Sequence, residues 1–107
     1  MVKIPTPPNH LSEKAKALWE KINSGWELDD LALTILEQAL THFDRAEQAK
    51  KLIEDEGLIV ENRAGTKKEN PAVTIERKSR DSMIRTLKVL NLEIEPLHEG
   101  RGRPGGT

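Results

Sequence analysis

The sequence lacks cysteine and tyrosine and has only two tryptophans and one phenylalanine among its 107 residues. The absence of cysteine excludes disulfides and thiolate chemistry. No stretch approaches the roughly 20 apolar residues of a membrane-spanning helix, and the first residues lack the apolar region of a signal peptide. We therefore expect a protein that is not secreted, does not enter a membrane and stays in the cytoplasm.

Patterns typical of catalytic or metal sites are also missing. The three histidines, His10, His42 and His98, lie in separate segments without the spacing of a zinc site. There is no glycine-rich phosphate loop and no recognisable Ser/His/Asp set. We therefore expect no metal, no cofactor and no enzymatic activity.

One acidic run, Glu54-Asp55-Glu56, requires an explanation. Successive side chains on a helix diverge by about 100°, so three consecutive carboxylates do not converge on one metal ion. At a helix C-terminus they also oppose the helix dipole, at a cost of about 0.3–1 kcal/mol each. A basic neighbour from this chain or another copy would offset that cost, and we expect the run to form ion pairs.

Charge is abundant and segregated along the chain. Charged residues make up 33% of the sequence, yet the net charge is only −1. Residues 27–56 carry nine acidic against three basic side chains, whereas residues 62–90 carry eight basic against three acidic ones. This segregation is typical of head-to-tail association, of nucleic-acid contact or of both, although solvated helix faces would produce the same pattern.

Apolar spacing and capping residues predict two helices in the first half of the chain. They follow an extended, proline-rich arm at 1–10. The first helix is predicted over about 11–23, where apolar residues recur at helical spacing. The second is predicted over 30–56, with Asp29 as its N-cap and Gly57 just past its end, and would be about 40 Å long.

After the second helix the pattern changes to that of a β-hairpin at about 58–69, with a turn at 62–65. An N-cap asparagine followed by Pro71 predicts the start of a third helix that runs to about residue 90. Its inward residues are expected to be Ile75, Met83, Leu87 and Leu90. The expected fold is mainly α: a single three-helix domain over 11–94 with a long central helix, and a flexible tail at 95–107.

The second helix has an apolar arc of roughly 200°, which is wider than one partner helix covers. Two surfaces are therefore expected to pack on it, and we expect one of them to belong to another subunit. The protomer would then assemble into a closed oligomer of more than four subunits. The residues expected at the subunit interface are Leu31, Leu33, Leu36, Leu40, Phe43, Glu54, Asp55, Glu56 and Arg80.

Basic residues in the second half of the chain are the remaining functional signal. They are Arg63, Lys67 and Lys68 on the hairpin, and Arg77, Lys78, Arg85 and Lys88 on one flank of the third helix. This arrangement is more typical of phosphate contacts than of base recognition. Lys14, Lys16 and Lys21 of the first helix are competing candidates for DNA binding. A solvated helix face explains the basic flank equally well.

The order of these elements resembles that of the phage terminase small subunits. The matching features are Pro8, Leu11, Ala15 and Trp19 at the start; Asp29 or Asp30 before the long helix; Gly57-Leu58-Ile59-Val60 after it; Gly65; Asn70-Pro71; and Leu90-Asn91-Leu92, Pro96, Arg101 and Arg103 at the end. The resemblance spans about residues 5–103. It is carried by the order and spacing of the features together.

The resemblance implies a non-catalytic protein in the cytoplasm of a bacterial host. Such a protein forms a homo-oligomeric ring, binds double-stranded viral DNA, and presents it to the terminase large subunit, which carries the ATPase and nuclease. Two alternatives stay open. One is a small helical DNA-binding regulator that places its basic helix in a groove. The other is an oligomeric adaptor without a nucleic-acid role, whose charges only join subunits.

Overall fold

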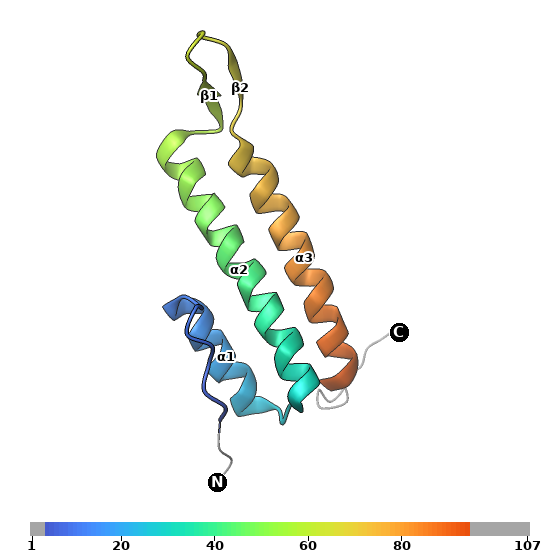
Figure 1. The fold of residues 1–107 in the computed structure, drawn as a ribbon. Coiled ribbons are helices and arrows are strands. Elements are labelled where there is room, and N and C mark those ends of the chain that lie inside the picture. The colour runs from blue at the N-terminus through green and yellow to red at the C-terminus, as the bar shows by residue number, and fades with distance from the viewer. Residues whose placement is uncertain (1–3, 95–107) are drawn as a thin grey trace.

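The computed structural model describes residues 4–94, which form three helices and one two-stranded antiparallel hairpin (Figure 1). The elements in chain order are α1 (Glu13–Gly25), α2 (Asp30–Glu56), β1 (Ile59–Glu61), β2 (Lys67–Glu69) and α3 (Pro71–Ile94). The mainly helical fold with a hairpin between the second and third helices is therefore confirmed. The tail expected at 95–107 lies outside the described residues.

The start of α1 is determined by a capping serine. The Ser12 hydroxyl accepts a hydrogen bond from the backbone N–H of Ala15 at 3.0 Å, so the helix begins at Glu13 rather than at residue 11. The arm before it is held against the helix, because the Trp19 indole N–H donates to the carbonyl of Pro5 at 2.9 Å. Trp19 itself is buried, so the arm helps to close the core.

The central helix has the predicted bounds. The Asp29 carboxylate caps it by accepting from the backbone N–H of Ala32 at 2.8 Å. Gly57 follows the last turn with φ of 91°, a conformation that favours glycine. Both ends of this helix therefore depend on residues that act locally, which is why sequence reasoning located them.

The hairpin is shorter than predicted, with three residues in each strand. Its register pairs Ile59 with Glu69, Val60 with Lys68 and Glu61 with Lys67. The turn is held by the Asn62 side chain, whose oxygen accepts from the backbone N–H groups of Ala64 and Thr66, both at 2.9 Å. Figure 1 shows that the hairpin projects beyond the ends of α2 and α3.

The third helix begins where Asn70-Pro71 predicted. The buried Asn70 side chain accepts from the N–H of Ala72 at 3.0 Å and donates to the carbonyl of Gly57 at 2.9 Å. The helix ends at Ile94, four residues beyond the predicted Leu90. Nothing between Leu90 and Ile94 breaks a helix, and Pro96, which disfavours helical backbone at the residue before it, comes after Ile94.

Two surfaces pack on α2, as its broad apolar arc predicted, and both come from the same chain. Figure 1 shows α3 antiparallel beside α2 along most of its length, and α1 beside its N-terminal half. Small buried residues (Ala39, Ala46 and Ala49 on α2, Ala72 and Ser79 on α3) allow the long helices to approach closely. The main core contains Leu11, Ala15, Trp19, Ala32, Leu36, Leu40 and Leu90. The expectation that Ile75 faces inward is wrong, because it is 45% exposed.

Candidate nucleic-acid interface

Four cations of α3 share its outward face. Ala72, Ser79 and Leu90 of this helix are buried, and at 3.6 residues per turn the opposite face carries Arg77, Lys78, Arg85 and Lys88. All four of these cations are exposed, as is Asp81 between them. Within residues 4–94 none of the four forms an ion pair. This basic face is therefore free to contact an anionic partner.

The cations of the hairpin do not form one surface. Residues opposite each other in an antiparallel pair share a face, and successive residues of a strand point to opposite faces. Lys67 therefore lies on the face of its partner Glu61, and Lys68 lies on the other face with Val60. Lys67 and Lys68 cannot both contact one flat anionic surface, so the structure separates two residues that the sequence grouped together.

The competing lysines of α1 are less available. The Lys14 ammonium is 3.2 Å from the carboxylate of Glu47 on α2, and the Lys16 ammonium is 3.9 Å from that of Glu13. Lys21 is exposed, and no ion pair involves it within residues 4–94. The structure therefore leaves α1 one unpaired lysine of the three, compared with four unpaired cations on α3.

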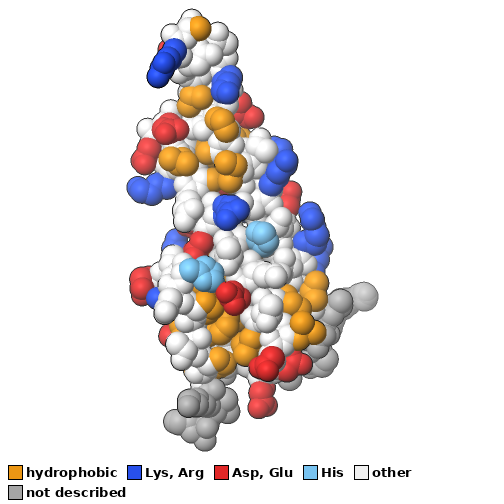
Figure 2. All heavy atoms as spheres, in the orientation of Figure 1, with side chains coloured by type: hydrophobic (Ala, Val, Ile, Leu, Met, Phe, Trp, Pro, Cys, Tyr) orange, Lys and Arg blue, Asp and Glu red, His pale blue; other side chains and the backbone are white. Residues whose placement is uncertain are grey.

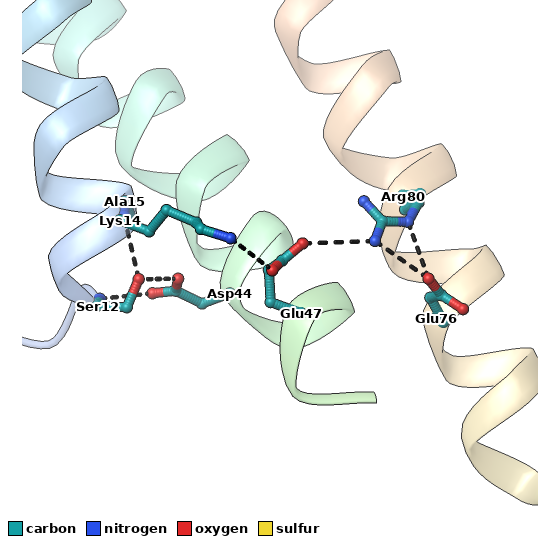
Figure 3. Close-up of polar contacts among 7 residues, drawn as sticks. All are labelled: Ser12, Lys14, Ala15, Asp44, Glu47, Glu76 and Arg80. Carbon is teal, nitrogen blue, oxygen red and sulfur yellow. Dashed lines mark hydrogen bonds and ion pairs between the residues drawn. The ribbon is translucent and has the colours of Figure 1, made fainter. Parts of the chain in front are cut away.

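A polar cluster on α2 connects all three helices (Figure 3). The Glu47 carboxylate accepts from Lys14 of α1 at 3.2 Å and from Arg80 of α3 at 3.5 Å. Hydrogen bonding to Lys14 is the largest of the effects that lower the pKa of Glu47 below its ordinary value. One turn earlier, the Asp44 carboxylate accepts from the backbone N–H of Ser12 at 2.8 Å and from its hydroxyl at 2.5 Å.

This cluster was not predicted from the sequence. Arg80 was expected at a subunit interface, but its guanidinium bonds within the chain, to Glu47 and also to Glu76 at 3.1 Å. The sequence carries one usable signal, a serine before an acidic first turn, which is typical of an N-cap. The pairing of α2 carboxylates with α1 and α3 depends on how the helices pack, which local spacing does not reveal.

The apolar residues expected at a subunit interface divide into three groups. Leu36 and Leu40 are buried in the protomer's own core, so their surface is already covered without a second chain. Leu33 and Phe43 are half-buried against that core. Leu31 is 69% exposed and alone among the five remains fully available to a partner. The breadth of the apolar arc is explained by α1 and α3 and requires no other subunit.

The acidic run at the end of α2 is exposed and partly compensated within the chain. Lys51 lies 4.0 Å from the Asp55 carboxylate, and the Asn70 side-chain amide donates to Glu56 at 3.3 Å. Because α3 is antiparallel to α2, its positive N-terminal end also lies near this run. No ion pair involves Glu54 or Glu56 within residues 4–94. The ion pairing expected for this run is therefore found for Asp55 alone among the three.

Within the part of the chain that the structure describes, no group of three or more histidine, aspartate or glutamate residues could hold a metal ion. No described helix combines the length and the apolar character needed to cross a membrane.

The described residues form a small helical protein whose third helix carries an exposed basic face. The family model of the phage terminase small subunit matches residues 15–96, which is most of the chain. The chain therefore belongs to the phage terminase small-subunit family. No match was found among curated proteins or among solved structures.

Proposed function

We propose that this chain is the non-catalytic, DNA-recognising small subunit of a phage DNA-packaging terminase. It assembles into a homo-oligomeric ring, binds double-stranded viral DNA through the basic face of α3, and presents it to the large subunit. Family membership supports the role in DNA packaging. The observation that carries the DNA-binding proposal is the outward face of α3, where Arg77, Lys78, Arg85 and Lys88 are exposed and unpaired within the described chain.

The composition of this face favours phosphate contacts over base recognition. Residues 77–88 extend about 17 Å along the helix at about 1.5 Å per residue, so the cations can meet several successive phosphates. Long flexible cations fix position on the duplex, but they carry little sequence information without base-edge contacts. Repetition of the face around a ring would raise affinity through multivalency, although each single contact is weak.

The salt dependence of DNA binding tests this proposal. Replacing the four α3 cations with glutamine should reduce the slope of log affinity against log salt by about 0.9 for each phosphate of duplex DNA that is no longer neutralised. The matched control replaces Lys14, Lys16 and Lys21 with glutamine and should leave most of the slope. Light scattering on each variant distinguishes weaker DNA binding from weaker assembly.

Each outcome has a definite meaning. An intact oligomer with an unchanged slope would remove the α3 face from the DNA site, and a flattened slope in the α1 variant would assign DNA binding to the first helix. A dimer with operator-like specificity would favour a regulator. No DNA binding at low salt would favour an adaptor. A stable monomer at micromolar concentration would contradict the ring.

A further inference from the structure

The junction between α2 and the hairpin exposes three large apolar side chains. Leu58 and Ile59, which follow the end of α2, are 62% and 57% exposed, and Leu52 in the last two turns of α2 is 46% exposed. Figure 2 shows hydrophobic side chains gathered over the end of α2 and the base of the hairpin. We refer to Leu52, Leu58 and Ile59 as the neck patch. Large apolar side chains grouped on an exposed surface are typical of protein–protein interaction sites.

The hairpin beside the neck patch has little support from its own chain. A two-stranded hairpin is marginally stable alone in water. Every residue of β1 and β2 is exposed except Val60, which is half-buried. The hairpin is attached to the helices at its base, where the backbone N–H of Asn70 donates to the carbonyl of Leu58 at 2.7 Å. A second surface that covers the hairpin would stabilise both its strands and the neck patch.

The charges around the neck patch indicate what that surface is. The exposed acids Glu54, Asp55 and Glu56 make this end of α2 unfavourable for nucleic acid. Glu56 follows Leu52 by four residues and so shares its flank of the helix, and it forms no ion pair within residues 4–94. A suitable partner is apolar and basic. The hairpin of this chain has that character, with Val60 at its centre and Arg63, Lys67 and Lys68 toward its tip, none of which forms an ion pair in the described chain.

We propose that the neck patch is a subunit interface, covered by the hairpin of a second copy of this chain. This inference rests on the proposed assembly and specifies where the subunits meet. Val60 and Lys68, which share one face of the hairpin, then lie against the neck patch and Glu56 of the next copy. Such a contact joins unlike surfaces, so it is head-to-tail and closes into a ring when the rotation between copies permits.

The proposal divides the cations of this chain between two roles. Lys68 of the hairpin joins subunits, whereas the cations of the α3 face remain for DNA. It also moves the interface away from Leu36 and Leu40, which the protomer buries itself. Leu31, the one exposed apolar residue of the set expected from the sequence, lies near the opposite end of α2 from the hairpin.

Removing the apolar surface tests the proposal directly. The variant Leu58→Thr/Ile59→Thr places β-branched threonine, which suits a strand, at both positions but removes the large apolar side chains. Its matched control is Ile84→Thr/Val89→Thr, because these α3 residues are exposed to a similar extent, at 48% and 46%. Light scattering at micromolar concentration should give monomer mass for the neck variant and wild-type mass for the control. Wild-type mass for the neck variant, or equal dissociation of both variants, would overturn the proposal.

Charge reversal gives a second test that does not depend on apolar truncation. Glu56→Lys and Lys68→Glu should each weaken assembly at low salt, and the two changes combined in one chain should restore it. If the combined variant assembles no better than either single variant, the pairing is wrong. Helical circular dichroism on every variant shows whether the protomer remains folded.

The proposed function and this inference fail in different ways. A wild-type chain that is monomeric at micromolar concentration would contradict the ring and, with it, the interface. A wild-type oligomer that the neck substitutions leave unchanged would contradict only the interface. DNA affinity measured at low salt on the same samples shows whether the α3 face still binds when the subunits dissociate.

Discussion

Truncation of Leu36 tests whether this residue stabilises the protomer or joins subunits. The sequence placed Leu36 and Leu31 together at an interface, but the structure buries the first completely and leaves the second 69% exposed. Leu36→Ala and Leu31→Ala therefore make the same chemical change on the same helix in opposite environments. The change in helix propensity is common to both and cancels in the comparison.

The magnitude follows from the surroundings of Leu36. It lies in the core cluster that includes Leu11, Trp19 and Leu90, so its truncation removes buried methyl groups and leaves a cavity bounded by three helices. Leu→Ala at such a position lowers the free energy of unfolding by about 2–5 kcal/mol. For a domain of this size each kcal/mol lowers Tm by about 4–8 °C, so the fall should be at least about 8 °C. Leu31→Ala should change the free energy of unfolding by less than about 0.5 kcal/mol.

Thermal and urea unfolding at several protein concentrations give the measurement. Truncation of a core residue lowers the free energy of unfolding by the same amount at every protein concentration. Truncation of an interface residue lowers it by an amount that depends on protein concentration, because assembly is linked to folding. The core assignment is refuted if Leu36→Ala costs no more than Leu31→Ala, or if its cost disappears when protein concentration is raised.

Two further predictions concern the ends of α2 and its link to the other helices. Gly57→Ala should lower the free energy of unfolding by about 1–3 kcal/mol in urea titration, because Gly57 has φ of 91° and ψ of 169°, a region nearly exclusive to glycine; an unchanged stability would show that the chain relaxes there at no cost. Glu47→Gln should lower stability by about 0.5–1 kcal/mol at neutral pH, because its two ion pairs are partly exposed. The pKa of Glu47 is lowered in the folded state, so this contribution is present above the ordinary value of 4.5 and is lost as pH falls through the folded value. Urea titrations of both proteins from pH 7 to pH 3 should therefore converge, and a constant difference would contradict the role of the carboxylate charge.

The elements of this chain were largely predictable because their signals are local. Asp29 and Gly57 bound the long helix correctly, and Asn70-Pro71 located the start of α3, since each acts on backbone groups within a few residues. The basic flank of α3 was also predictable, because helical spacing places its residues opposite the inward face. Whether that flank binds DNA stays a proposal.

The packing of these elements was decided only in three dimensions. The sequence predicted correctly that two surfaces cover α2, but periodicity does not state which chain supplies them, and the structure assigns both to α1 and α3 of the same protomer. For the same reason the pairing of Arg80 with Glu47 and Glu76 inside the protomer was not predicted, and its expected place at a subunit interface stays a prediction. An apolar arc or a charged side chain in the sequence specifies the kind of neighbour that a residue needs. The lengths and packing of the helices determine which residue becomes that neighbour, because burial and ion pairing depend on distance in space.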